Sequence, residues 1–343
     1  MCSIIGSIQK ELRRSGIDLC HPIHTSWYNT LIREEGLVEN GALKTLPEPP
    51  AILHGEEGTN CAVNALLIGN TKEVWQIFLK WLASRVEQKK NENKDLNDEE
   101  ALEQISMPVD TFVEESILQA LQRCCDGRSD LNSYELFWSN GKRQKVITNQ
   151  QSEHTARGNA ASAEMSNCCY MRDEENSFLV SMQRVAMTTG HYWHDNDATK
   201  LCVHPEYGTW TAFRTVVVFS YKTRDPHSSI PPAPPMCPCP VSEEEIKMAK
   251  TVFDYALRMS SSDEQGYGTT LNKSWAELCE YLHGTVCSGN DWDQVPETMK
   301  PWIQLRDCFS VGREHWKYSQ PQLLYHYTKD PVILRTELRR IDR

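Results

Sequence analysis

The proline-rich stretch of residues 224–240 is the feature that most constrains how this chain can fold. Proline lacks a backbone N–H and fixes φ, so it is excluded from helix interiors and central strands. The stretch therefore predicts an extended linker. It divides the 343 residues into a core, residues 1–223, and a C-terminal cap or extension, residues 241–343. A chain of this length has room for one large domain or for a core that carries a smaller one.

Hydrophobic spacing predicts several helices in the core. Apolar residues recur at helical spacing over residues 4–12 and stop before Gly16. Further helices are expected over residues 25–36, 109–123 and 159–172. Residues 62–69 are typical of a buried strand, and Asn70, with Glu73 three residues later, is expected to cap a helix through about Val86. Residues 87–103 are highly charged and indicate a surface loop or a disordered insertion.

Turn residues predict β-structure in the second half of the core. Asn140–Gly141 favours a tight turn, so residues 134–147 are expected to form a hairpin. A second strand pair is expected between residues 200–204 and a long strand at 209–221. After the linker, Ser242 and Glu245 form a capping box at the start of a helix. This mixture favours an α+β architecture over a doubly wound parallel sheet.

Charge and hydropathy exclude two classes of partner. The formal net charge of −11 argues against a broad nucleic-acid-binding surface. The sequence has no apolar run long enough for a membrane span, so no membrane is expected. Residues 1–19 lack the apolar segment of a secretory signal, which predicts a cytoplasmic protein. In that compartment the 13 cysteines are expected to be reduced thiols.

Arg214 is the odd residue of the long predicted strand. With a period of two, it shares a strand face with four apolar residues, Trp210, Ala212, Val216 and Val218. A buried guanidinium is costly unless it is paired and hydrogen-bonded. Arg214 is therefore expected to pair with an internal carboxylate, to lie at a sheet edge, or to bind an anionic ligand.

Other chemical motifs are weak. His191, His194, Asp195 and Asp197 are close in sequence, but zinc sites usually combine two ligand pairs, and the sequence shows no second pair of that kind. We therefore expect no metal ion bound directly by the protein. The sequence also has no nucleophile elbow, no P-loop and no dinucleotide-binding glycine motif.

The sequence around Arg214 resembles the central motif of the type C cobalamin-processing family, whose members are cyanocobalamin reductases and alkylcobalamin dealkylases. The matching residues within 200–218 are Cys202, His204, Pro205, Tyr207, Gly208, Trp210 and Arg214. Weaker matches follow in the same order as in the family, at residues 26–31, 142–146, 317–325 and 331–338. Inserts are expected near residues 87–105, 149–157, 177–195 and 241–295.

The resemblance implies a fold and an activity. The expected fold is a core like that of flavin-dependent nitroreductases, with an antiparallel sheet and a smaller cap region. The expected activity is removal of the upper axial ligand of cobalamin, which is bound base-off. Reductive decyanation would use a reduced flavin (FMN or FAD) or an NADP-linked flavoprotein reductase, and dealkylation would use glutathione. A cobalamin-trafficking adaptor and the methionine synthase system are the implied protein partners, with a monomer or weak homodimer as the oligomeric state.

The resemblance also implies which residues bind these molecules. Glutathione is expected to be bound and activated by four arginines, Arg172, Arg214, Arg306 and, across a small gap, Arg335. A guanidinium can grip a carboxylate through two hydrogen bonds, and positive neighbours favour a thiolate. Cobalamin is expected to contact ten residues: Glu135, Val146, Ile147, Thr148, Asn149, Cys169, Tyr170, Met171, Cys202 and Phe213. The alternative for Val146, Ile147 and Phe213 is ordinary strand core.

The chain departs from the family pattern at three places. The aromatic run before Arg172 is replaced by Cys168, Cys169 and Tyr170. A histidine of the family falls at Ser162, unless His154 takes its place, and a second glycine of the motif is Thr209. These changes leave open whether cyano or alkyl ligands are preferred. Two other functions remain as alternatives: a non-catalytic cobalamin escort, and a flavin-dependent reductase with another substrate.

Overall fold

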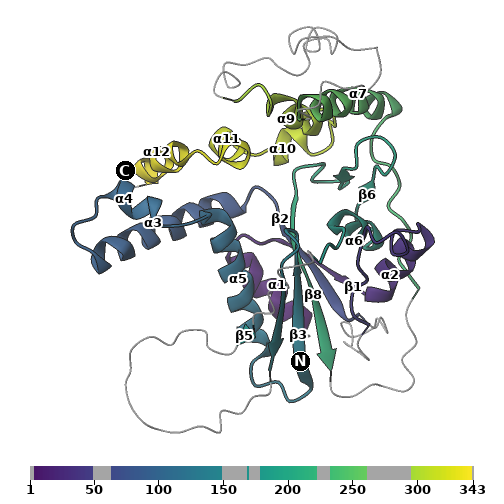
Figure 1. Ribbon diagram of the computed structural model, residues 1–343, viewed down its shortest axis with the longest axis horizontal. Coiled ribbons are helices and arrows are strands. Elements are labelled where there is room, and N and C mark those ends of the chain that lie inside the picture. The colour runs from purple at the N-terminus through teal and green to yellow at the C-terminus, as the bar shows by residue number, and fades with distance from the viewer. Residues whose placement is uncertain are drawn as a thin grey trace. The chain divides into compact units, whose positions relative to one another are not determined.

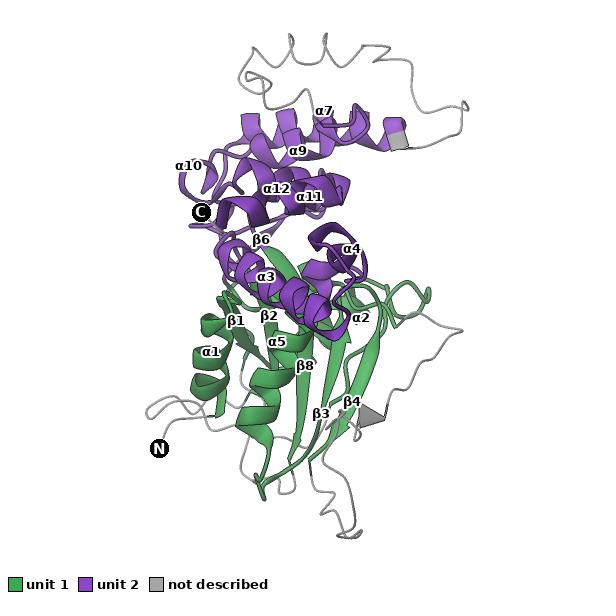
Figure 2. Cartoon of the chain, turned by 90° about the vertical axis from the view of Figure 1, so that its left-hand side faces the viewer, with its two compact units in different colours: residues 1–70, 113–190, 212–236 green, residues 71–112, 191–211, 237–343 purple. Residues whose placement is uncertain are grey.

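The computed structural model describes residues 4–48, 63–148, 178–221, 232–260 and 295–341, together with the backbone of Cys168–Cys169. The chain forms two compact units (Figure 2). Unit 1 comprises residues 1–70, 113–190 and 212–236, and unit 2 comprises residues 71–112, 191–211 and 237–343. Unit 2 thus includes two segments that precede the proline-rich stretch.

Unit 1 is built on one sheet of six strands in the order β1-β2-β8-β3-β4-β5, and every pairing is antiparallel. The strands are β1 (Leu19–Ile23), β2 (Ala65–Asn70), β3 (Leu131–Trp138), β4 (Arg143–Ile147), β5 (Cys168–Cys169) and β8 (Ala212–Tyr221). Helices and an antiparallel sheet in one chain confirm the predicted α+β class. The predicted hairpin is also confirmed, because β3 pairs with β4 across a turn in which Gly141 has a φ of +82°.

Four helices pack on this sheet (Figure 1). They are α1 (Ile4–Arg14), α2 (Thr25–Glu34), most of α5 (Pro108–Cys125) and α6 (Met182–Thr188). The ribbon shows α1 and α5 on one side of the sheet and α2 and α6 on the other. The predicted apolar stripe of α1 is confirmed, since Ile4, Ile5, Ile8 and Leu12 are all buried. The helix ends before Gly16, whose φ of +71° is a left-handed conformation that glycine adopts readily.

Helix α2 anchors the chain that follows it. The Asn29 side-chain amide donates to the backbone oxygen of Leu46 at 2.8 Å and accepts from the Leu46 N–H at 2.8 Å. The Tyr28 hydroxyl donates to the backbone oxygen of Lys44 and accepts from the N–H of Ser181 at 3.2 Å. Asn29 is fully buried, so these bonds satisfy a polar group that water cannot reach.

Unit 2 is mostly helical. Its helices are α3 (Val74–Glu92), α4 (Asp98–Glu103), α7 (Glu243–Ser260), α9 (Lys300–Asp307), α10 (Arg313–Trp316), α11 (Gln320–Thr328) and α12 (Pro331–Ile341). The predicted capping box of α7 is confirmed: the Glu245 N–H donates to the Ser242 hydroxyl, and the Glu245 carboxylate accepts from the Ser242 N–H at 2.8 Å. Two buried clusters stabilise the unit, one around Phe309 and one around Trp210.

Three local predictions were wrong. Residues 87–103 are largely helical, because α3 continues to Glu92 and α4 begins with a capping box between Asn97 and Glu100. Asn70 ends strand β2 and does not cap α3, whose N-cap is Glu73. The strand at residues 200–204 is the short β7 (Cys202–Val203), which pairs with β6 (Trp193–His194) and not with the long strand. The helix predicted at 159–172 lies outside the described residues, apart from β5.

Candidate functional site

Arg214 lies in β8, a central strand of the sheet, with β2 on one side and β3 on the other. The edge position is therefore excluded. Its Nε donates to the side-chain oxygen of Asn70 at 2.7 Å. The guanidinium is only partly buried, while Val216 and Val218 further along the strand are buried. The sheet thus holds a permanent positive charge, oriented by a neutral amide, at the end of an apolar row.

A close approach of the β2 and β8 backbones at Gly69 allows Asn70 to reach Arg214. The register between β2 and β8 shifts at Ile68 and Gly69, opposite Arg214. A Cβ at Gly69 would lie 2.6 Å from the backbone oxygen of Ala212, so only glycine fits between the strands there. The bulge brings Asn70 level with Ala212, where its amide reaches the guanidinium.

The residues predicted to contact cobalamin in unit 1 lie on both faces of the sheet. Glu135 pairs with Val218 and shares its face of the sheet, about 13 Å along β8 from Arg214. Ile147 lies on that face as well and is 47% exposed. Val146 pairs with Tyr134, and neighbouring residues of a strand point to opposite faces, so Val146 points to the other face.

The remaining unit 1 residues complete this picture. Phe213 pairs with Gly69 at the bulge, where the alternation of side chains along β8 is interrupted. Thr148 follows β4 and donates its hydroxyl to the backbone oxygen of Leu131 at 2.7 Å. Glu135 is nearly buried and forms an ion pair with Arg143. The structure therefore brings Glu135 and Ile147 to one face of the sheet and leaves Val146 on the other.

Several predicted site residues lie outside the described residues: Arg172, Asn149, Tyr170 and Met171, and also His154 and Ser162. Cys169 is described only by its backbone in β5, where it pairs with Lys145. Their predicted roles stay predictions.

The motif that precedes Arg214 forms a tight turn in unit 2. The N–H groups of Glu206 and Tyr207 donate to Nδ1 of His204 at 3.0 and 3.2 Å, and the imidazole stacks on the Tyr207 ring at 4.3 Å. Burial, with a smaller contribution from His191, lowers the pKa of His204 to about 4. Gly208 has a φ of +58°, and a Cβ there would lie 1.9 Å from the backbone oxygen of Val311. His204 and Gly208 of this motif therefore have structural roles: His204 accepts hydrogen bonds from the turn, and Gly208 allows the close approach to Val311.

Cys202 begins the same motif. Its side chain is buried in β7, and burial raises the pKa of the thiol far above its ordinary value. A thiol that stays protonated at neutral pH is a poor nucleophile. Cys202 is therefore suited to contact a neutral ligand or to pack, and not to attack one.

Arg306 holds the end of the turn. Its Nε and Nη2 both donate to the backbone oxygen of Thr209, and the Thr209 hydroxyl donates back to the Arg306 carbonyl at 3.1 Å. The guanidinium lies 4.4 Å from the ring centre of Trp210 and 4.8 Å from that of Tyr318. Arg306 is only 9% exposed, so this contact is a buried cation–π stack on both rings.

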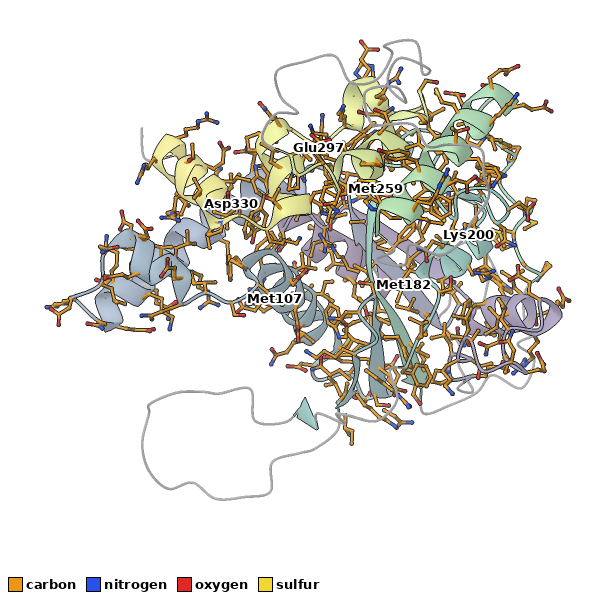
Figure 3. The ribbon with its side chains drawn as sticks, turned by 45° about the horizontal axis from the view of Figure 1, so that its top comes forward. Met107, Met182, Lys200, Met259, Glu297 and Asp330 are labelled. Atoms are coloured by element: carbon orange, nitrogen blue, oxygen red, sulfur yellow. The ribbon has the colours of Figure 1, made fainter. Side chains whose placement is uncertain are left out.

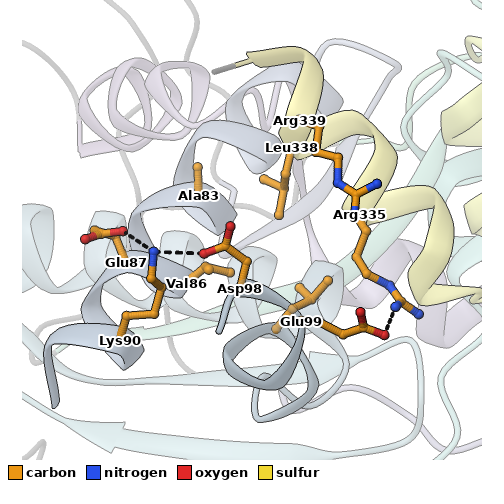
Figure 4. Close-up of a pocket in the computed structure, with 10 residues that line it drawn as sticks. Ala83, Val86, Glu87, Lys90, Asp98, Glu99, Arg335, Leu338 and Arg339 are labelled. Atoms are coloured by element: carbon orange, nitrogen blue, oxygen red, sulfur yellow. Dashed lines mark hydrogen bonds and ion pairs between the residues drawn. The ribbon is translucent and has the colours of Figure 1, made fainter. Parts of the chain in front are cut away.

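Arg335 lines a cavity of about 310 Å³ (Figure 4). The cavity lies among α3, α4 and α12, and Arg335 forms an ion pair there with Glu99. Within unit 2, Arg306 and Arg335 thus occupy different surroundings, one a buried stack and the other a lined cavity. Lys90, Asp98 and Arg339 of the same cavity were missed from the sequence, although the Asn97–Glu100 capping box could have indicated the helix that brings Asp98 there.

A second cavity of about 330 Å³ adjoins α4 and is more apolar. It is lined by Tyr325, Leu334 and Met107, whose side chain is 65% exposed (Figure 3). The described residues contain no group of three histidine, cysteine, aspartate or glutamate side chains that could hold a metal ion. Nor does any helix among them have the length and apolarity to cross a membrane.

Comparisons with known proteins show likeness to solved structures only. No protein-family model matches the sequence. No curated protein matches it either. Among solved structures, the chain is similar to the crystal structure of a Caenorhabditis elegans B12-trafficking protein CblC, a human MMACHC homologue, with 17% identity and a TM-score of 0.49. The match covers 98% of this chain and 93% of the other. At this identity and TM-score the likeness does not establish a shared function.

Proposed function

We propose that this protein binds cobalamin in the base-off form and removes its upper axial ligand. The observation that carries the proposal is the placement of Arg214. The stretch with the type C resemblance, residues 200–218, ends in a central strand that holds one oriented guanidinium beside an apolar row. Such a group suits an anionic co-substrate that must meet a large, mostly neutral ligand. The solved structure reported above is described as a B12-trafficking protein, and the ligand proposed for this chain is of the same chemical class, a cobalamin.

For an alkylcobalamin, the proposed co-substrate is glutathione. Its thiol loses a proton to solvent, and the thiolate attacks the alkyl carbon that is bound to cobalt. A carbon–sulfur bond forms and the carbon–cobalt bond breaks, with the electron pair staying on cobalt. The products are a thioether and cob(I)alamin. No external oxidant or reductant is needed.

In this step Arg214 binds a glutathione carboxylate. Two parallel N–H···O bonds fix the position of the tripeptide, and the positive charge favours the thiolate over the thiol. Asn70 fixes the orientation of the guanidinium through the 2.7 Å bond to Nε. Arg306 acts as a positioning residue, since its side chain holds the turn from which β8 continues. Arg335 and Arg172 remain the further arginines that the resemblance assigns to the same ligand.

For cyanocobalamin, one electron reduces cobalt and cyanide leaves. The proposed donor is a reduced flavin or a flavoprotein reductase. The two cavities described above have no donor set that identifies a flavin site. The base-off form contributes here because loss of the lower ligand makes cobalt easier to reduce.

The proposal is tested on Arg214. Removal of one charge-assisted contact costs about 1.5–3 kcal/mol, so Arg214→Ala should lower glutathione-dependent dealkylation by about ten- to a hundredfold, with a much smaller effect on cobalamin binding. Arg214→Lys should restore only part of the activity, because an ammonium lacks the planar fork. Arg123→Ala is the matched control, since Arg123 lies exposed on α5 and pairs with Glu11.

Cobalamin affinity, melting temperature and the glutathione concentration dependence are measured for all three variants. A purely structural arginine predicts lower stability with an unchanged glutathione dependence of the folded fraction. That result would refute the role of Arg214.

A further inference from the structure

The cavity that contains Arg335 has an arrangement of charges of which the proposed function uses only Arg335. Its lining comprises three acids, three bases and four apolar residues: Glu87, Asp98, Glu99, Lys90, Arg335, Arg339, Ala83, Val86, Leu102 and Leu338. They come from α3, α4 and α12, all within unit 2. A volume of about 310 Å³ is at the small end of the range for ligand pockets.

One side of the cavity has an excess of negative charge. The Lys90 ammonium lies 2.8 Å from Asp98 and 3.2 Å from Glu87. Hydrogen bonds to these two carboxylates raise the pKa of Lys90, so it stays charged. Two carboxylates on one ammonium leave a formal charge of −1 in this group. It can therefore accept one further cation.

Another side has an excess of positive charge. Arg335 is neutralised by its ion pair with Glu99. Arg339 has no ion pair or hydrogen bond with any residue that the structure describes. The close-up shows the Lys90 group on one side of the view and Arg339 on the other (Figure 4). The cavity thus has a negative pole and a positive pole.

Apolar side chains complete the lining. Ala83 and Leu338 are partly exposed and give the cavity its accessible aliphatic surface, next to the buried Val86 and Leu102. Such a surface favours an aliphatic group by about 25 cal/mol for each Å² removed from water.

We infer that this cavity binds a short zwitterion with an aliphatic body, of the class of small aliphatic peptides with free termini. The ligand's ammonium lies against the carboxylates of Glu87 and Asp98. Its carboxylate binds the guanidinium of Arg339 through two parallel hydrogen bonds. Its aliphatic side chains pack on Ala83 and Leu338. Binding of this zwitterion requires neither cobalamin nor Arg214.

The test is isothermal titration of the full-length protein with the dipeptide leucyl-leucine. Binding is expected, and removal of either terminal charge should weaken it. N-acetyl-leucyl-leucine lacks the ammonium, and leucyl-leucine amide lacks the carboxylate. Each should bind about three- to tenfold more weakly, the effect of one partly exposed ion pair. Glutathione, with an excess negative charge and a polar body, should bind more weakly still.

Matched variants locate the site. Arg339→Gln should weaken leucyl-leucine by about three- to tenfold and leave the affinity for the amide unchanged. Arg340→Gln is its control, because Arg340 is adjacent, pairs with Glu337 and does not line the cavity. Asp98→Asn should weaken leucyl-leucine but not the N-acetylated form, with Asp95→Asn as its control.

Three results would overturn the inference. The first is the absence of binding at millimolar dipeptide. The second is equal binding of the dipeptide and its two blocked forms. The third is glutathione binding that exceeds leucyl-leucine binding and is lost in Arg339→Gln, which would assign the cavity to glutathione.

Discussion

Arg306→Met separates a structural role of this arginine from direct contact with glutathione. Methionine keeps an unbranched side chain but removes both donors to the Thr209 carbonyl. Loss of a charge-assisted hydrogen bond costs about 1.5–3 kcal/mol. Loss of the stacking on Trp210 and Tyr318, at 4.4 and 4.8 Å, adds about 1–2 kcal/mol for each ring.

Part of this loss is offset, because the variant no longer buries a charge. The net expectation is a decrease of about 2–4 kcal/mol in the free energy of unfolding, a large share of the total of about 5–15 kcal/mol for a typical domain. Urea unfolding followed by tryptophan fluorescence and by circular dichroism measures it. Arg340→Met, at an exposed arginine, is the control and should change stability by less than about 0.5 kcal/mol.

Unchanged stability combined with lost glutathione dependence would contradict the structural role of Arg306. If Arg306→Met unfolds within about 1 kcal/mol of the parent protein and yet loses glutathione dependence, then the arginine binds the co-substrate and does not hold the turn. Equal urea midpoints for Arg306→Met and Arg340→Met would be sufficient to show that Arg306 does not stabilise the turn.

Three further predictions follow from the same geometry. Gly208→Ala should destabilise the protein strongly, because its Cβ would overlap the Val311 carbonyl and its φ is +58°; an unchanged melting temperature would contradict the close approach. His204 has a folded pKa of about 4, below the ordinary value of 6.5, so its neutral form stabilises the fold above pH 6.5 and this contribution is lost as the pH falls toward 4. The urea midpoint should therefore fall more steeply between pH 6.5 and 4 than in His204→Asn, and parallel curves would show that His204 does not contribute. Asn29→Ala should speed amide hydrogen exchange at Leu46 and lower the free energy of unfolding by about 1–3 kcal/mol, since it leaves buried backbone groups of Leu46 without partners; exchange at the parent rate would argue against the anchor.

Local signals in the sequence predicted local structure well. The Ser242–Glu245 capping box and the Asn140–Gly141 turn both occur where expected, because each depends on residues a few positions apart. The prediction of an apolar stripe on α1 is confirmed for the same reason. The prediction of a loop for residues 87–103 was wrong because a highly polar segment can still be helical. Ion pairs such as Lys89–Glu92 and the capping box at Asn97 stabilise the helices there.

Contacts between distant residues could not be predicted in this way. Arg306 and Thr209 are 97 residues apart, and no spacing rule connects them. Strands β6 and β7 have two residues each, too few to show a period. The alternation around Arg214 did identify the exceptional charge in β8, but its partner, the amide of Asn70, depends on the bulge at Gly69, which the sequence did not reveal.

The central claim is base-off binding of cobalamin, and a visible absorption titration tests it most directly. Purified full-length protein is added to cyanocobalamin until the spectrum no longer changes. We expect conversion to the base-off spectrum in proportion to protein added, and the same conversion with Arg214→Ala. A spectrum that stays base-on at saturating protein, or that does not respond to the protein at all, would contradict it.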